Sequence, residues 1–208
     1  MSRGLGDVYK RQVYGRSLRK AAVVFAVAPS LGAEARARFG LEAERVVVAP
    51  NAVSRTFVLS EGTERDGALV VSRDEPRKAR GAAELAAREA GLELTIVDDE
   101  RDDPRLAAHY ARARWLLAPS LHEGYGMTVA EALACGTPVV ATDHAAHRDI
   151  ERLGARGIVF VPPPRRAGDD WQWPEAVAAL RGALPADIAP PPTTWDETAA
   201  IVADAIGR

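Results

Sequence analysis

The sequence has little cysteine, few aromatic residues and no long hydrophobic run. Its one cysteine, Cys135, excludes an intrachain disulfide framework and a metal site built from several cysteines. Aromatic residues make up 6% of the chain and apolar residues 47%, so the hydrophobic core must be aliphatic. The longest apolar run, residues 21–28, is far shorter than the roughly 20 residues of a membrane-spanning helix. No secretory leader pattern is visible, and we expect a soluble, cytoplasmic protein.

The chain also lacks a large excess of charge of either sign. It has 27 Lys and Arg against 29 Asp and Glu, a formal net charge of −2. This balance excludes the strong positive field of a general nucleic-acid binder, although it allows a local anion site. Lysine itself is scarce, with only Lys10, Lys20 and Lys78 in an arginine-rich chain. Arginine and alanine enrichment is typical of GC-rich coding sequence, so each lysine stands out.

The first twelve residues, MSRGLGDVYKRQ, differ in composition from the rest of the chain. Residues 7–12 resemble the translation of a transposase-based sequencing adapter. We therefore expect residues 1–12 to be non-native and to have no part in the fold, the genuine sequence to begin near Val13, and its upstream part to be missing. The alternative is a basic native N-terminus.

From residue 21 onward, short β-branched runs alternate with Ala-rich helical patterns. This alternation predicts an α/β fold with a parallel sheet and helices on both faces. Residues 53–66 are polar and without periodicity, which is typical of a linker. Strands are expected at 22–28, 45–49, 67–72, 92–97, 115–118, 138–142 and 157–161, and helices at 34–39, 79–90, 105–114, 127–135, 145–153, 174–184 and 194–206.

Ligands of such sheets bind beyond the carboxyl ends of the strands. The loop after Ser72 carries two cations five residues apart, Arg73 and Lys78. Arginine as a flat fork and lysine as a point charge can together bind a diphosphate. The alternative is an ordinary charged loop whose cations pair with neighbouring acidic residues.

A second loop, Glu123-Gly124-Tyr125-Gly126, runs into the helix expected from Met127. Two glycines before a helix allow a close approach of backbone to a ligand, and the free N–H groups of a helix start favour an anion. Glu131 lies within that helix among apolar neighbours. A buried carboxylate needs donors, and sugar hydroxyls can supply them; the alternative is a solvated Glu131 that interacts with the helix dipole.

These residues belong to a longer stretch, PSLHEGYGMTVAEALACGTPVVATD at 119–143. It resembles the signature of the retaining glycosyltransferases of the group 1 type (family 4), which have the two-domain, Rossmann-like B fold. That family has a glutamate, seven residues and a second glutamate, here Glu123 and Glu131. It also has an arginine and a lysine five apart after the first strand of its second domain, here Arg73 and Lys78.

The resemblance implies a role for each of these positions. Arg73, Lys78 and the backbone N–H groups near Gly126 and Met127 would bind the diphosphate of a nucleotide-sugar donor, and Glu131 would accept from the ribose. The transferred sugar and its developing positive charge would face the catalytic residue, Glu123, with Gly124 and Tyr125 beside it. Cations and helix-end dipoles stabilise a leaving diphosphate, so no metal or other cofactor is expected.

The resemblance also implies a domain organisation. The glycine loop and the histidine usual in the family's N-terminal domain have no counterpart here. We therefore expect this fragment to bind nucleotide but to transfer no sugar. The expected parts are residues 13–52, a remnant of the N-terminal acceptor domain; 53–66, a linker; 67–185, the donor domain; and 186–208, a C-terminal crossover helix.

The implied function is transfer of a sugar from a nucleotide sugar to an unknown acceptor, with no nucleic-acid partner. No transmembrane segment is expected, and peripheral membrane contact through the missing domain stays open. The rivals are a non-catalytic nucleotide-sugar-binding or partner subunit, an epimerase on the same fold, and a phosphorylase. A phosphorylase would need a lysine that binds its cofactor, and after residue 12 the chain has only Lys20 and Lys78.

Several single residues have ordinary structural interpretations. We expect Cys135 to be a packed thiol with no cation to activate it, and Trp171 and Trp173 to pack a loop onto the domain. His122 borders the Glu123 loop and could touch the donor, although a loop histidine is usually solvated. His144 and His147 flank the end of the strand expected at 138–142, and a functional role is not expected for either.

Overall fold

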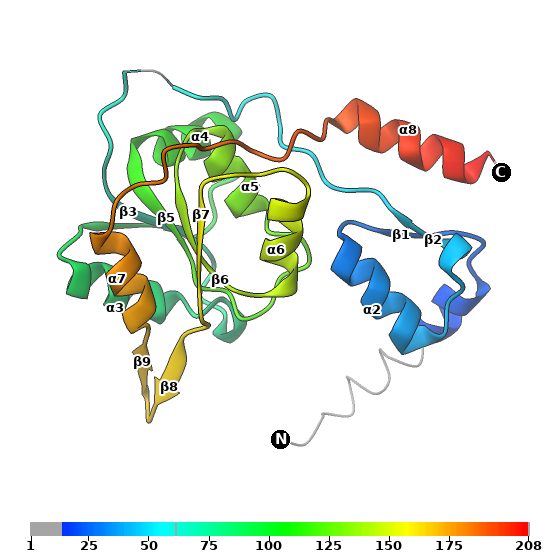
Figure 1. Cartoon of the computed structure of the whole chain (residues 1–208), viewed down its shortest axis with the longest axis horizontal. Helices are drawn as coiled ribbons and strands as arrows, with labels where there is room; N and C mark the ends of the chain where they lie inside the picture. Colours follow the sequence, from blue (N-terminus) through cyan, green and yellow to red (C-terminus); the bar gives the residue numbers. More distant parts are fainter. Residues whose placement is uncertain (1–13, 61, 208) are drawn as a thin grey trace. The chain divides into compact units, whose positions relative to one another are not determined.

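The computed structural model describes residues 14–60 and 62–207 (Figure 1). The prediction that residues 1–12 are non-native concerns residues outside this described part of the chain. The chain divides into two compact units. One contains the described residues up to Asn51 together with those from Trp195 onward, and the other contains the chain from Ala52 to Thr194.

The first unit is built around two short parallel strands, β1 (Val24–Ala26) and β2 (Val46–Val48). Helix α2 (Pro29–Phe39) connects them through the 3₁₀ turn η1 (Ala43–Arg45). Helix α8 (Trp195–Ile206) belongs to the same unit, where the Thr198 hydroxyl donates to the Pro50 carbonyl at 2.7 Å. The sequence predicted a strand up to residue 28 and a helix only from residue 34, which left Pro29 outside both. Instead it starts α2, because a proline at the first helical position has no N–H to lose and its φ already suits a helix.

The second unit contains a five-stranded parallel sheet with the order β4-β3-β5-β6-β7. Its parallel pairing confirms the sheet type predicted from the alternating sequence pattern. The elements, in chain order, are β3 (Asp66–Val71), η2 (Pro76–Lys78), α3 (Arg80–Ala90), β4 (Leu94–Val97), α4 (Asp103–Arg112), β5 (Ala113–Ala118), α5 (Met127–Ala134), β6 (Val139–Thr142), α6 (Ala145–Arg152), β7 (Ile158–Val161), β8 (Arg165–Ala167), β9 (Asp170–Gln172) and α7 (Pro174–Arg181).

Both faces of this sheet are buried, and each has its own core. Successive side chains of a strand point to opposite faces, so Leu116 joins one core and Trp115 with Leu117 joins the other. The first core includes residues of α4, α5 and α6, and the second includes residues of α3 and α7 (Figure 1). Strands buried on both faces have near-continuous apolar runs, which is why the sequence pattern was recognisable.

A hairpin of β8 and β9 was not predicted. Gly168 and Asp169 connect the two antiparallel strands, and Gly168 has a φ of 65°. A glycine followed by Asp between two strands is a hairpin signal; the strands were missed because they have only three residues each and are largely polar. Trp173 then enters the core with 1% of its surface exposed, and its indole N–H donates to the Pro162 carbonyl at 2.8 Å. This tryptophan therefore packs the hairpin's end onto the domain, as expected.

The segment 53–66 has no helix or strand in its described residues before Asp66, yet its side chains are anchored. Phe57 is buried and meets the Tyr110 ring edge-on at 6.0 Å. The Arg65 guanidinium donates to the Thr137 hydroxyl at 2.7 Å and to the Cys135 carbonyl at 2.6 Å. Arginine has five donors in a rigid fork, and here it ties the segment before β3 to the residues that follow α5.

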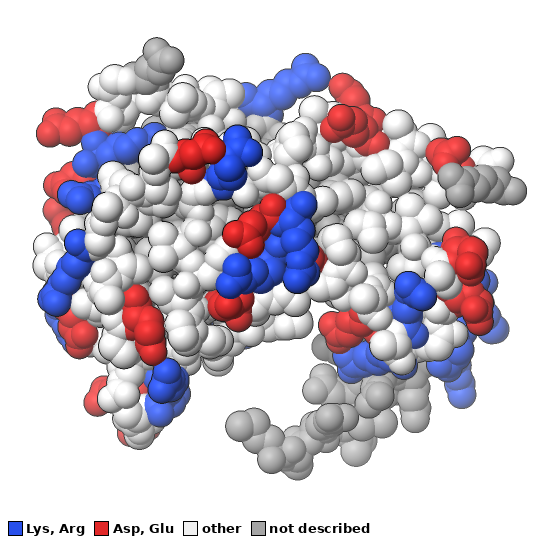
Figure 2. Space-filling view, viewed as in Figure 1, with Lys and Arg blue, Asp and Glu red and all other residues white. Residues whose placement is uncertain are grey.

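The surface carries both signs of charge. On the face drawn in Figure 2, Lys and Arg side chains are interspersed with Asp and Glu side chains. No helix within residues 14–60 and 62–207 is long and apolar enough to cross a membrane.

Candidate functional site

The candidate site lies at the carboxyl ends of three neighbouring strands, β3, β5 and β6. Because these strands are adjacent in the sheet, the loops that follow them lie together. Hydrogen bonds connect the loops directly: the Leu121 N–H donates to the Arg77 carbonyl at 2.8 Å, and the Thr142 hydroxyl donates to the Ser120 carbonyl at 2.6 Å. The two loops singled out in the sequence are therefore held side by side.

Lys78 and Glu123 form the central contact of this site. The Lys78 ammonium lies 2.5 Å from a Glu123 carboxylate oxygen, with 18% and 14% of the two side chains exposed. Burial raises the pKa of Glu123, but hydrogen bonds from Lys78 and Ser120 outweigh it and hold that pKa below its usual value. Glu123 is thus a carboxylate at neutral pH beside a cation. Ala79, which follows Lys78, has a φ of 47°, an unfavourable conformation for a residue with a Cβ.

Arg73 is in the same loop as Lys78, but its side chain has a different partner. Its guanidinium lies 3.1 Å from Asp99, in the loop after β4, and both side chains are more than half exposed. An exposed ion pair of this kind contributes little stability. Arg73 can therefore exchange Asp99 for another anion at small cost, whereas Lys78 is already held in place.

The Glu123–Gly126 loop ends at the start of α5. Gly126 has a φ of 102° and offers no side-chain cap, so the first N–H groups of α5 are not capped by a side chain at that position. Met127, the first residue of α5, is half-buried. Gly124 is exposed, whereas Tyr125 is 4% exposed. Burial raises the pKa of Tyr125 to about 12, and its hydroxyl has no hydrogen-bond partner in the described part of the chain.

Glu131 is half-buried on α5 and is paired with a residue that the sequence analysis did not single out. The Tyr110 hydroxyl, on α4, donates to one Glu131 oxygen at 2.9 Å. Burial raises the pKa of Glu131, and the bond from Tyr110 partly offsets this effect. The ordinary alternative of a solvated Glu131 does not describe this carboxylate, because it is half-buried and hydrogen-bonded to Tyr110.

Two histidines join the site at the start of α6. The rings of His144 and His147 are stacked with centroids 3.9 Å apart. His147 is 1% exposed, its Nδ1 lies 2.9 Å from the Thr142 carbonyl, and burial lowers its pKa to about 4. A Cβ at Gly126 would lie 3.2 Å from the His147 ring, so this histidine packs beneath the turn that starts α5. The sequence signal that could have identified this pair is two histidines three residues apart, directly after an expected strand.

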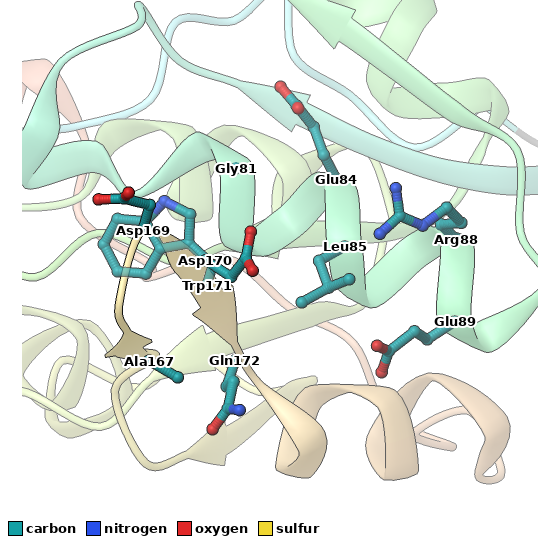
Figure 3. A pocket seen from close by; sticks show the side chains of 10 residues that line it. All are labelled: Gly81, Glu84, Leu85, Arg88, Glu89, Ala167, Asp169, Asp170, Trp171 and Gln172. Carbon is teal, nitrogen blue, oxygen red and sulfur yellow. The ribbon is translucent and has the colours of Figure 1, made fainter.

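A separate hollow of about 520 Å³ lies between α3 and the β8–β9 hairpin. Figure 3 shows Glu84, Arg88 and Glu89 projecting from α3, with Asp169 and Trp171 on the hairpin side. Carboxylates outnumber the one guanidinium in its lining. The surplus of negative charge would repel a diphosphate, so this hollow is not a candidate for the nucleotide.

The described residues contain no group of three or more His, Cys, Asp or Glu side chains that could hold a metal ion. The thiol of Cys135 is buried, and burial raises its pKa to about 11. The expectation that no cation lies beside this thiol is wrong, because Arg65 lies close enough to lower its pKa, but burial has the larger effect. A thiol with a raised pKa is a poor nucleophile at neutral pH, which agrees with the expected packing role.

The sequence profile of the family "Glycosyl transferases group 1" matches residues 59–180, more than half of the chain. The chain belongs to this family of glycosyltransferases. The matched region contains every candidate residue at the ends of β3, β5 and β6. The family and the parallel sheet predicted from the sequence are both confirmed.

The chain is similar to curated bacterial proteins over part of their length. It is 28% identical over 170 residues to the D-inositol 3-phosphate glycosyltransferase of Thermobispora bispora, which covers 73% of this chain and 39% of that protein. It is 34% identical over 85 residues to the GDP-mannose-dependent alpha-(1-6)-phosphatidylinositol dimannoside mannosyltransferase of Mycobacterium tuberculosis, covering 41% and 21% of the two chains. The chain thus spans about two fifths or less of these relatives.

Solved structures show the same fold. Sucrose-phosphate synthase from Thermosynechococcus elongatus aligns with a TM-score of 0.61 and 20% identity over 96% of this chain and 54% of that chain. The Anabaena protein Alr3699/HepE, solved in complex with UDP and glucose, aligns with a TM-score of 0.59 and 17% identity over 74% and 53%. At these identities the likeness shows the fold alone, which is the glycosyltransferase B fold.

Proposed function

We propose that the loops after β3, β5 and β6 form the donor site of a retaining glycosyltransferase that takes a sugar from a nucleotide sugar. The observation that carries this proposal is the Lys78–Glu123 contact beside the uncapped start of α5. A cation, a carboxylate and a helix start without a side-chain cap thus lie in the two adjoining loops. Relatives named as glycosyltransferases, and a similar fold solved with UDP and glucose, support it.

In this proposal the cations and the helix start act on the leaving group. The bond between the sugar C1 and a diphosphate oxygen breaks while a bond from C1 to an acceptor hydroxyl oxygen forms. The diphosphate accumulates negative charge as it leaves and takes up the proton of the acceptor hydroxyl. Lys78 and the N–H groups at Gly126 and Met127 stabilise that charge because they are fixed before the reaction, and Arg73 joins them by exchanging Asp99 for the diphosphate. No metal is required for this step.

The two glutamates act on the rest of the donor. The Glu123 carboxylate faces the sugar and stabilises positive charge at C1, with Gly124 and Tyr125 alongside. Glu131 accepts from the ribose hydroxyls while Tyr110 holds its other oxygen. The acceptor, which would be bound by a further domain in a complete enzyme, is not specified by these residues. We also propose a cytoplasmic location, which suits a chain with one free cysteine.

The test is a calorimetric titration of the chain, begun at Val13, with UDP, GDP and ADP. We expect one of the three to bind and the variant Arg73→Ala/Lys78→Ala to lose at least about tenfold in affinity, the effect of losing charge-assisted hydrogen bonds. Lys20→Ala, in the first unit, is the matched control and should bind like the parent.

Two results would contradict the proposal. If the folded chain binds none of the three diphosphates, the result favours the alternative that this protein keeps the fold of the family without a working donor site. Binding that survives the double substitution would place the nucleotide elsewhere.

A further inference from the structure

His144 occupies a distinctive place in the candidate site. It follows β6 and caps the start of α6: its Nδ1 accepts a hydrogen bond from the His147 backbone N–H at 3.4 Å. A neutral imidazole has one donor and one acceptor nitrogen. Because Nδ1 is the acceptor, the proton of neutral His144 is on the distal nitrogen, Nε2.

That Nε2–H donor is buried without an acceptor. Within residues 14–60 and 62–207, the His144 Nε2 atom has no hydrogen-bond partner. A buried donor without an acceptor costs free energy comparable to a lost hydrogen bond. Native structures rarely keep such a group unless something else, such as a ligand, supplies the acceptor.

The surroundings of His144 indicate where that acceptor comes from. The ring stacks on His147, which packs beneath the Gly126 turn. Burial lowers the pKa of His144, while Glu123 of the loop after β5 raises it and His122 of the same loop lowers it. His144 is therefore a neutral donor at pH 7, within electrostatic reach of the carboxylate at the centre of the proposed donor site.

We propose that the Nε2–H of His144 donates a hydrogen bond to an oxygen of the bound donor's sugar diphosphate, which makes His144 a further binding residue of this site. The inference rests on the proposed function, since it needs the donor to bind between the loops after β3, β5 and β6. The acceptor oxygen belongs either to a phosphate or to a sugar hydroxyl, which share the ability to accept from a neutral N–H. His147 has a different role, because its Nδ1 is already engaged by the Thr142 carbonyl.

A purely structural role for His144, capping α6, makes a different prediction, and two substitutions separate the roles. Asparagine places a side-chain acceptor where Nδ1 lies and is among the best N-cap residues, but it has no group at the position of Nε2. Glutamine reaches the position of Nε2 with an N–H donor but is a poor cap. His144→Asn thus keeps the cap and removes the donor, and His144→Gln does the reverse.

The experiment measures thermal unfolding and calorimetric affinity for both variants. The probes are the nucleoside diphosphate that binds the parent chain and its glucose and mannose conjugates. We expect His144→Asn to unfold at the parent's temperature but to bind about three- to tenfold more weakly, the effect of one lost hydrogen bond. His144→Gln should unfold at a lower temperature and keep more of the affinity.

The pattern of loss identifies the oxygen. Weaker binding of the diphosphate itself assigns a phosphate oxygen, and weaker binding of a conjugate alone assigns a sugar hydroxyl. Parent-like affinity of His144→Asn for the diphosphate and both conjugates overturns the proposal and leaves His144 as a cap. Lys78→Ala is measured in parallel, so that failure of the inference about His144 can be told from failure of the proposed donor site. If Lys78→Ala abolishes binding and His144→Asn does not change it, only the inference about His144 is wrong. A parent chain that binds no probe overturns both.

Discussion

A carboxylate removed from water needs hydrogen-bond donors, and at the residue scale Glu131 shows how this chain supplies one. Its donor, Tyr110, lies 21 residues earlier and is fully buried with its ring in the core. Burial raises the pKa of both groups, because it disfavours the charged form of each. The spacing to Glu123 indicated Glu131 from the sequence, but nothing in the local pattern around Tyr110 indicated that its hydroxyl would face a carboxylate.

Tyr110→Phe should destabilise the fold in a pH-dependent way. Since the folded pKa of Glu131 is raised, the folded state holds its proton more tightly than the unfolded state, and stability falls as pH rises from the ordinary carboxyl pKa to the raised one. Removing the Tyr110 hydroxyl raises that pKa further. We expect a loss of about 1–3 kcal/mol in the free energy of unfolding at pH 7 and a smaller loss at pH 4, measured by urea denaturation.

The control is the same substitution in a Glu131→Gln background, where the cost should no longer depend on pH. Equal losses at pH 4 and pH 7 in the parent background would show that the hydroxyl does not act through the Glu131 carboxylate.

At the element scale, the turn from β5 into α5 decides whether the loops can meet. Gly126 has a φ of 102°, and a Cβ there would lie 3.0 Å from Ile150 and 3.2 Å from the His147 ring, both on α6. The glycine therefore allows α5 and α6 to approach where the site is built. Gly124, two residues earlier, is exposed, and a Cβ on it would meet no atom of the described chain within 4 Å.

The pair Gly126→Ala and Gly124→Ala tests this difference. Gly126→Ala should cost about 1–3 kcal/mol, because it combines an unfavourable φ with a crowded Cβ, and should weaken nucleotide binding by displacing the loop. Gly124→Ala should leave stability within about 0.5 kcal/mol of the parent. Urea denaturation of both variants checks the prediction; similar costs at the two positions would mean that the turn has no special constraint.

At the scale of the whole molecule, the candidate site belongs to one of the two units. The residues of both cores and every candidate site residue lie between Ala52 and Thr194. The segment before β3 adds to the independence of this unit, because Phe57 and Arg65 anchor it to the same core.

We therefore expect residues 52–194, expressed alone, to unfold cooperatively and to bind the same nucleoside diphosphate as the longer chain. Each core is complete within this segment, so no buried contact of the sheet is lost. Circular dichroism during heating and calorimetric titration with the nucleotide measure the two properties. A fragment with helical signal but no cooperative transition would show that the first unit is needed for the fold of the second.

Several features were determined by the sequence alone. Buried parallel strands have apolar runs, and helices have a different period, so local pattern was enough for the α/β class and for most elements. The motif with Arg73, Lys78, Glu123 and Glu131 was also visible, because its spacing is a property of the chain. The β8–β9 hairpin was not predicted, because strands of three largely polar residues have no distinguishable hydrophobic pattern.

Which side chains meet depends on how the elements pack in three dimensions. The order β4-β3-β5-β6-β7 brings Lys78 to Glu123 across 45 residues and brings His144 within electrostatic reach of Glu123. The same packing gives Glu131 its partner on α4 and pairs Arg73 with Asp99 of the loop after β4. These contacts depend on strand order, helix packing and the direction of each side chain, which are non-local properties, so no window of sequence contains them.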